Sequence, residues 1–245
     1  PPAVVPPNGL IDLDERMSSA EQAPRCDILI RRFTANLADH PDTQAIRRQL
    51  LIALSAAGRY AEAVERLRQW RQESPDDLDI NSQLATTLLL AGRNDEAVAL
   101  AENLAGGETV SDDHRWLLVR VYWQVGRLDE AIARLESLMQ HSPMGDRLEQ
   151  EMIRLWLAAG RIDDAIARAQ TVMNDRPDAR PAMVRLLTMA YETRHSPELA
   201  ARTLETECER TPYDPTINND LGYLWADMGV NLAPAERMIR LAVGQ

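Results

Sequence analysis

Apolar positions recur along this chain with the spacing of helices that bury one face, and a short turn interrupts them at a fixed interval. The turn is a Gly-Arg pair that returns at one constant spacing (the repeat period), at Gly58-Arg59, Gly92-Arg93, Gly126-Arg127 and Gly160-Arg161. Five residues after each glycine stands an alanine: Ala63, Ala97, Ala131 and Ala165. Apolar residues precede the turns at matching points: Leu50, Leu84, Leu118, Met152, Leu186 and Leu221. This sustained period predicts stacked helical hairpins, each packing its apolar face on the next.

Two later copies of the turn depart from the pattern. The fifth lacks its glycine, and the repeat period aligns it at Arg194-His195. The sixth is shifted by one residue and centres on Gly229. The first helix of each hairpin (helix A) is expected to end at the turn. The second (helix B) should begin after it, where acids such as Asp163-Asp164 complement the helix dipole.

Prolines and the period together predict the domain boundaries. Residues 1–24 contain four early prolines and no lasting period, which indicates a linker that is disordered or only loosely docked. A solenoid is expected over residues 25–245, beginning with half a repeat at 26–43 whose helix runs from Cys26 to about Asp39. Full repeats are predicted at 44–77, 78–111, 112–145, 146–179, 180–214 and 215–245.

The last repeat shows a family pattern. Leu221-Gly222, followed by Trp225, Gly229 and Ala235, resembles the Leu-Gly-x-x-Tyr…Gly…Ala pattern of the tetratricopeptide repeat (TPR) superfamily. Tyr122 and Trp156 hold the aromatic position in earlier repeats, whereas larger residues replace the glycine of the Leu-Gly pair. The resemblance covers about residues 26–245 and is closest to bacterial TPR-type proteins. It implies an all-α fold, a right-handed TPR superhelix (α-solenoid) of about six and a half helix-turn-helix repeats.

The resemblance also implies that helix A lines a concave surface, and the helical spacing i, i+4, i+7 selects the side chains that face it. In the third to fifth repeats the projected groove residues are Trp116, Arg120, Trp123, Gln150, Arg154, Leu157, Thr188 and Tyr191. The same projection places Val184 on this face in the fifth repeat, and Asn219, Tyr223 and Ala226 in the sixth.

Two interpretations of the projected groove stay open. Aromatic side chains beside Arg120 and Arg154 are typical of interface hot spots, and guanidinium groups bind carboxylates, so the patch would hold a peptide with acidic and apolar groups. Alternatively, the two arginines pair with the nearby Asp113 and Glu151 while the tryptophans simply pack.

Charge and motif content narrow the function classes. A net charge of −11 argues against nucleic-acid binding, which needs a basic surface. No apolar run reaches the ~18 residues of a membrane span, so direct membrane insertion of this segment is not expected. The four histidines fall mostly at turns or repeat junctions, and no sequence motif of a catalytic, metal or cofactor site is present. We therefore expect neither an enzyme nor a cofactor-binding protein.

The predicted function is a non-catalytic scaffold or adaptor for protein–protein interaction that binds a peptide or protein segment in the helix-A groove. One alternative is a homo-oligomer that self-associates through an uncapped C-terminal helix face bearing Ala235, Met238, Ile239 and Leu241. Another is the recruitment domain of a larger multidomain protein. The chain begins at Pro1 without methionine, so we expect a fragment of a longer precursor. A soluble protein of the bacterial cytoplasm or periplasm is expected, with the compartment left open.

Overall fold

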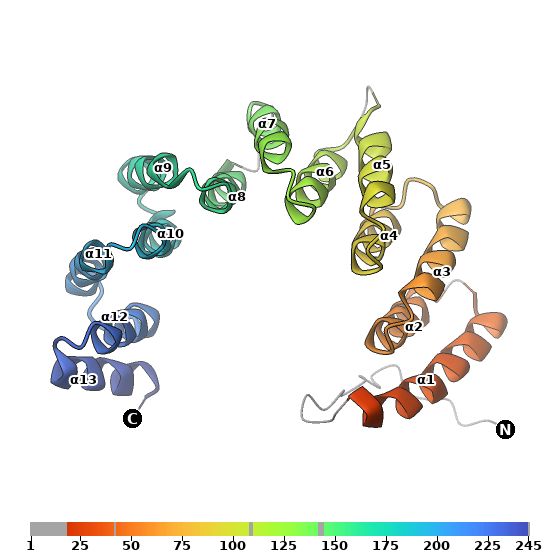
Figure 1. The fold of residues 1–245 in the computed structure, drawn as a ribbon, viewed down its shortest axis with the longest axis horizontal. Helices are drawn as coiled ribbons and strands as arrows, with labels where there is room; N and C mark the ends of the chain where they lie inside the picture. Colours follow the sequence, from red (N-terminus) through yellow and green to blue (C-terminus); the bar gives the residue numbers. More distant parts are fainter. Residues whose placement is uncertain (1–18, 42, 108–109, 142–144, 245) are drawn as a thin grey trace. The chain divides into compact units, whose positions relative to one another are not determined.

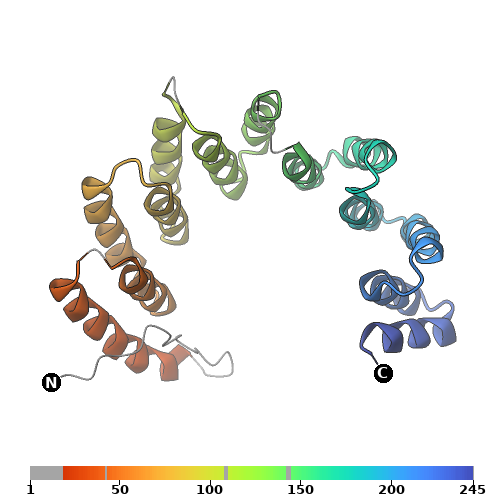
Figure 2. The same ribbon diagram turned by 180° about the vertical axis from the view of Figure 1, so that it is seen from behind.

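A computed structural model of the protein describes residues 19–41, 43–107, 110–141 and 145–244. These residues form thirteen α-helices and no β-strand, which confirms the all-α repeat fold predicted from the sequence (Figure 1). The chain divides inside α6 (Asp112–Gln124) into two compact units, residues 1–117 and 118–245. Within each unit, helices that are consecutive in the sequence lie beside one another in both views (Figure 1 and Figure 2).

Helices α1 to α5 belong to the first unit, and α6 begins there. Their bounds are α1 Ser19–Asp39, α2 Gln44–Ala56, α3 Tyr60–Glu73, α4 Leu78–Leu90 and α5 Asn94–Ala105. The second unit holds the rest of α6 and seven further helices. These are α7 Leu128–Met139, α8 Gly145–Ala158, α9 Ile162–Asp175, α10 Arg180–Thr193, α11 Pro197–Arg210, α12 Pro215–Asp227 and α13 Leu232–Ala242. In the predicted repeats, α2, α4, α6, α8, α10 and α12 are the A helices.

Helix α1 ends at Asp39 as expected, but it begins at Ser19, well before the predicted start at Cys26. The last part of the predicted 1–24 linker is therefore helical, whereas residues 1–18 lie outside the described part of the chain. The predicted helix began only after Pro24, because a proline was taken as a helix boundary. A proline removes only one backbone donor, however, and its φ is compatible with a helix, while the residues just before it are good helix formers.

A left-handed residue ends helix A in each of the first four complete hairpins. At Gly58, with φ of 67°, the backbone N–H donates to Ser55 O at 3.0 Å, and the next N–H, from Arg59, donates to Leu54 O at 2.8 Å. The same pair of bonds recurs at Gly92, Gly126 and Gly160, where φ lies between 72° and 79°. These two bonds satisfy carbonyls at the helix end and reverse the chain in a fixed geometry.

The fifth turn is formed by His195 instead of Arg194. His195 has a φ of 58°, its N–H donates to Glu192 O at 2.9 Å, and the N–H of Ser196 donates to Tyr191 O at 2.8 Å. The sequence alignment at Arg194 was therefore wrong by one residue, because a constant repeat period assumed no insertion. The extra residue lies between Gly160 and His195, and it turns the side chains at the end of α10 by about 100° relative to the projection.

The recurring small residues lie where helices A and B meet. Ala63, Ala97, Ala131 and Ala165 are completely buried, and so is Ala200, which follows His195 by five residues. Gly222 has the same role in the last hairpin, because a Cβ there would lie 2.8 Å from Ile239 Cγ1 and 3.0 Å from Ala235 O. Helices α12 and α13 therefore approach more closely at this point than any larger residue would permit.

The aromatic position of helix A connects neighbouring hairpins. Trp225 donates its indole N–H to Glu205 of α11 at 3.1 Å, and the hydroxyl of Tyr191 accepts a hydrogen bond from Gln170 of α9 at 3.0 Å. Tyr191 and Trp225 are one repeat period apart, so they occupy equivalent places. Tyr191 thus belongs to the packing between repeats, because the register of α10 is displaced by one residue.

The arginine after each turn glycine pairs with the acid that begins helix B. Arg59 pairs with Glu62, Arg93 with Glu96, Arg127 with Glu130 and Arg161 with Asp164. The hydrogen bond from Arg127 lowers the pKa of the Glu130 carboxyl, and the one from Arg93 lowers the pKa of Glu96. The predicted acids at these helix starts therefore have a specific partner in addition to the helix dipole.

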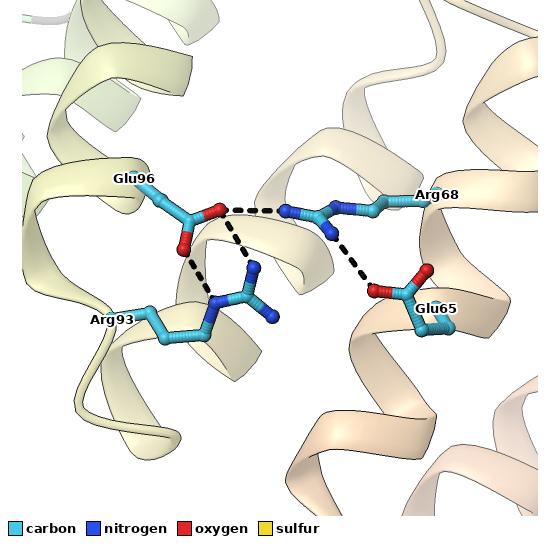
Figure 3. Close-up of polar contacts among 4 residues, drawn as sticks. All are labelled: Glu65, Arg68, Arg93 and Glu96. Atoms are coloured by element: carbon cyan, nitrogen blue, oxygen red, sulfur yellow. Dashed lines mark hydrogen bonds and ion pairs between the residues drawn. The ribbon is translucent and has the colours of Figure 1, made fainter.

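In the first unit this pairing extends from one hairpin to the next. Arg68 of α3 contacts Glu65 of its own helix at 2.8 Å and Glu96 of α5 at 2.6 Å, so Glu96 bridges two arginines (Figure 3). Arg93 donates to both oxygens of the same carboxylate, at 2.5 and 2.8 Å. The four residues form a chain of alternating charge that links α3 to the start of α5.

We predict that His195→Gly raises the free energy of unfolding by about 1 kcal/mol, because it removes the strain of a side chain at a left-handed position. His195→Ala is the matched control: it removes the imidazole but keeps a Cβ at the same φ, so it should give no such gain. Urea unfolding followed by circular dichroism measures both. Equal stability of the two variants would show that the backbone at this turn is not strained.

Because the pKa of Glu96 is lowered in the folded protein, its pairing stabilises the fold above the ordinary carboxyl pKa. That contribution disappears as pH falls through the lowered pKa. Glu96→Gln should therefore reduce the unfolding midpoint at neutral pH and low salt, with the difference from the wild type vanishing in acid and shrinking in high salt. The control is Glu136→Gln, an exposed acid without an ion pair among the described residues. A pH-independent difference would contradict the assignment.

Candidate functional site

The second unit contains a groove of about 410 Å³ on the face formed by its A helices. Helices α8, α10 and α12 supply most of its walls, and α11 contributes to the floor. The lining residues are Arg154, Arg185, Leu186, Thr188, Met189, Glu192, Leu204, Asp220, Tyr223, Leu224 and Asp227. The volume is large enough for several side chains of a peptide.

Apolar groups form the floor and the middle of the groove. Leu186, Leu204 and Leu224 are buried beneath it. Above them, Met189 of α10 and Tyr223 of α12 expose 45% and 56% of their surfaces, although both are large side chains that a stable core would cover. Their separation along the chain equals that of the turn residues His195 and Gly229, so they stand at the same level on neighbouring A helices.

Charged groups surround this apolar centre. Helical spacing places Arg185, Met189 and Glu192 along one stripe of α10, and Asp220, Tyr223 and Asp227 along one stripe of α12. Arg154 contacts Glu151 of its own helix at 3.2 Å, with 36% of its side chain exposed. Arg185, Glu192 and Asp227 have no ionic partner among the residues that the structure describes. Within the described part of the chain, the groove therefore offers one unpaired cation and more carboxylates than cations.

Three of the residues projected onto the groove face line the observed groove: Arg154, Thr188 and Tyr223. Thr188 is only 8% exposed, and its hydroxyl donates to Val184 O at 2.9 Å. Tyr191 was projected into the groove, but it is 9% exposed and packs in the core. Gln150 and Leu157 of α8 are half-buried and do not line this groove.

The remaining predicted residues belong to α6. Trp116, Arg120 and Trp123 are all half-buried. Trp116 lies in the first unit, and Arg120 and Trp123 lie in the second. None of the three lines the groove of α8, α10 and α12. Of the residues projected in the third to fifth repeats, only Arg154 and Thr188 line this groove.

The predicted groove lacked Arg185, Met189 and Glu192, which form the outward stripe of α10. It also lacked Asp220 and Asp227 of α12. The projection chose Val184, Thr188 and Tyr191 because it counted one repeat period forward from α8, across the inserted residue. Counting one period back from Tyr223 gives Met189. The sequence did contain a sign of this register. Gly229 marks the sixth turn, and counting one repeat period back from it gives His195, the residue that is left-handed in the structure.

Several other site types find no support in the described residues. They contain no group of three or more His, Cys, Asp or Glu side chains placed to hold a metal ion. Nor do they include a helix whose length and apolar character would let it cross a membrane. Burial, with a smaller effect of Glu209, raises the pKa of the Cys208 thiol. This disfavours the thiolate at neutral pH, whereas a cysteine nucleophile needs the thiolate to be favoured.

Comparison with known proteins identifies the repeat type. A family model for the tetratricopeptide repeat matches residues 54–106 and 111–190, together more than half of the chain. A tetratricopeptide repeat protein from Parabacteroides merdae has a similar fold, with 15% identity over 89% of this chain and 78% of that chain and a TM-score of 0.54. The TPR-like repeats of a putative kinesin light chain from Podosopora anserina align with 21% identity over 67% of this chain and 94% of that one, with a TM-score of 0.52.

A search of curated protein sequences finds no match to this chain. At the identities given above, the likeness to solved structures shows the fold alone. The family model and the paired helices with their repeated left-handed turns lead to the same conclusion: the chain belongs to the tetratricopeptide repeat family.

Proposed function

We propose that the protein is a non-catalytic scaffold that holds a peptide or protein segment in the groove of α8, α10 and α12. The observation that carries this proposal is the exposure of Met189 and Tyr223 at the same level above a floor of buried leucines. Exposed large apolar side chains that converge on one concave site favour a binding surface, because covering them with an apolar partner stabilises the complex. The TPR family, whose members commonly bind other proteins, fits this role.

The unpaired charges at the groove support a role in recognition. Ionic groups that already have partners, such as Arg93 and Glu96, contribute to the fold, and their charge is largely neutralised for a ligand. Arg185, Glu192 and Asp227 line the groove without such partners among the described residues. Polar and charged groups around an apolar centre are the usual arrangement of an interface that selects its partner.

A second candidate function is self-association through α13. Met238 and Ile239, two of the residues predicted for that surface, are half-buried, and Ala235 is buried. Leu241 is 47% exposed, and Leu232 and Val243, at the two ends of α13, are exposed too. Of the four residues predicted for this surface, only Leu241 is exposed. A molecular mass that rises with concentration in light scattering would favour this candidate over the groove.

The double substitution Met189→Ser and Tyr223→Ser should weaken peptide binding by at least ~2 kcal/mol, roughly thirtyfold, because it removes both apolar contacts at the centre of the groove. The ligands are peptides selected on the intact chain from a random dodecapeptide phage library, and affinity is measured by fluorescence anisotropy. The matched control is Leu199→Ser with Tyr213→Ser, an exposed leucine and tyrosine outside the groove. Equal binding to the groove variant and the wild type would rule out this site.

A further inference from the structure

We propose that the groove selects a basic, apolar segment, in which an arginine or lysine lies next to an aliphatic side chain. This inference rests on the proposed function of the same groove. Its basis is the position and pairing of the charges that line α10 and α12, together with the two apolar side chains between them.

Glu192 and Asp227 lie at the C-terminal ends of their helices, where a carboxylate lowers helix stability. Glu192 lies in the last turn of α10, which ends at Thr193, and Asp227 is the last residue of α12. The C-terminal end of a helix has a partial negative charge, so a carboxylate there is destabilising. Neither helix has a basic residue in its last turn to offset this. These two acids therefore do not stabilise their helices, whereas the acids at helix starts do.

The same two acids flank the apolar centre of the groove. Glu192 follows Met189 by three residues on α10, and Asp227 follows Tyr223 by four residues on α12, so each acid lies one turn beyond an exposed apolar side chain. A cationic side chain bound between α10 and α12 at this level would contact both carboxylates. Its aliphatic neighbour would cover Met189 and Tyr223, and the tyrosine ring also offers a face to a cation.

The groove's net charge also favours a basic partner over an acidic one. Among the residues that the structure describes, its unpaired groups are one cation, Arg185, and the carboxylates of Glu192 and Asp227. A third carboxylate, Asp220, has within the same residues only a long hydrogen bond of 3.5 Å from Asn219. The guanidinium of Arg154 is held by Glu151. An acidic segment would meet this surplus of negative charge and the chain's net charge of −11, which together attract cations from solution.

The test is the composition of peptides that depend on the groove. A random dodecapeptide phage library is panned on the intact chain and counter-selected on the Met189→Ser, Tyr223→Ser variant. We expect the surviving clones to be enriched in arginine or lysine beside leucine, isoleucine or valine. A synthetic peptide from the most enriched clone should bind the Glu192→Gln, Asp227→Asn variant at least about tenfold more weakly than the wild type, and binding should weaken as salt increases.

The matched control is Glu136→Gln with Asp178→Asn, two exposed acids of the second unit outside the groove, which should leave affinity within about twofold. Enrichment of acidic clones would overturn the inference and leave the proposed function in place. Basic clones that bind the Glu192→Gln, Asp227→Asn variant as tightly as the wild type would also overturn the inference. If no clone depends on Met189 and Tyr223, the proposed function fails, and the inference fails with it.

Discussion

The left-handed reversal that ends helix A is the constraint on which the rest of the structure depends. Two backbone hydrogen bonds close each reversal, and they fix the residue at which the helix stops. Because side chains on a helix are about 100° apart, the stopping point also decides which of them face the next hairpin and which face solvent. A change of one residue in this position exchanges core and surface, as α10 demonstrates through Tyr191 and Met189.

Charge has two distinct roles in the chain. Arginines that follow the turn glycines pair with the first acids of helix B, and in the first unit Glu96 extends that pairing to Arg68 of the preceding hairpin. These groups satisfy one another at exposed positions and act on the fold. Along the groove of the second unit, Glu192 and Asp227 occupy helix C-termini, where they oppose the dipole and have no partner among the described residues. Such groups are available to a ligand.

Most of the fold could be predicted because its determinants are local in sequence. Gly58, Gly92, Gly126 and Gly160 mark left-handed turns, since glycine adopts that backbone without strain, and the buried alanines follow at a constant distance. The start of α1 was missed because a proline was taken as a helix boundary. The fifth turn was misplaced because a constant repeat period was assumed and a histidine, not a glycine, holds the left-handed position.

The site was less predictable than the fold because it depends on helix register in three dimensions. Arg154, Thr188 and Tyr223 were projected onto the groove face. Met189 and Glu192 were missed because the inserted residue displaces the register of α10. The ion pairs of the site could not be read from the sequence either. The sequence left open whether Arg154 pairs with Glu151, and the structure shows this contact within α8. Whether carboxylates such as Asp227 lack a partner depends on every neighbouring helix, so local spacing does not determine it.

The register of α10 can be tested directly by the reactivity of single cysteines with a maleimide, in a chain whose native Cys26 and Cys208 are replaced by alanine. Met189→Cys should react at the rate of an exposed thiol. Val184→Cys, at a position that is 1% exposed, should react at least ~100-fold more slowly, because the thiol becomes accessible only when the helix opens locally. Rapid modification at position 184 with protection at position 189 would place α10 in the register of an uninterrupted repeat period and contradict the account of the groove.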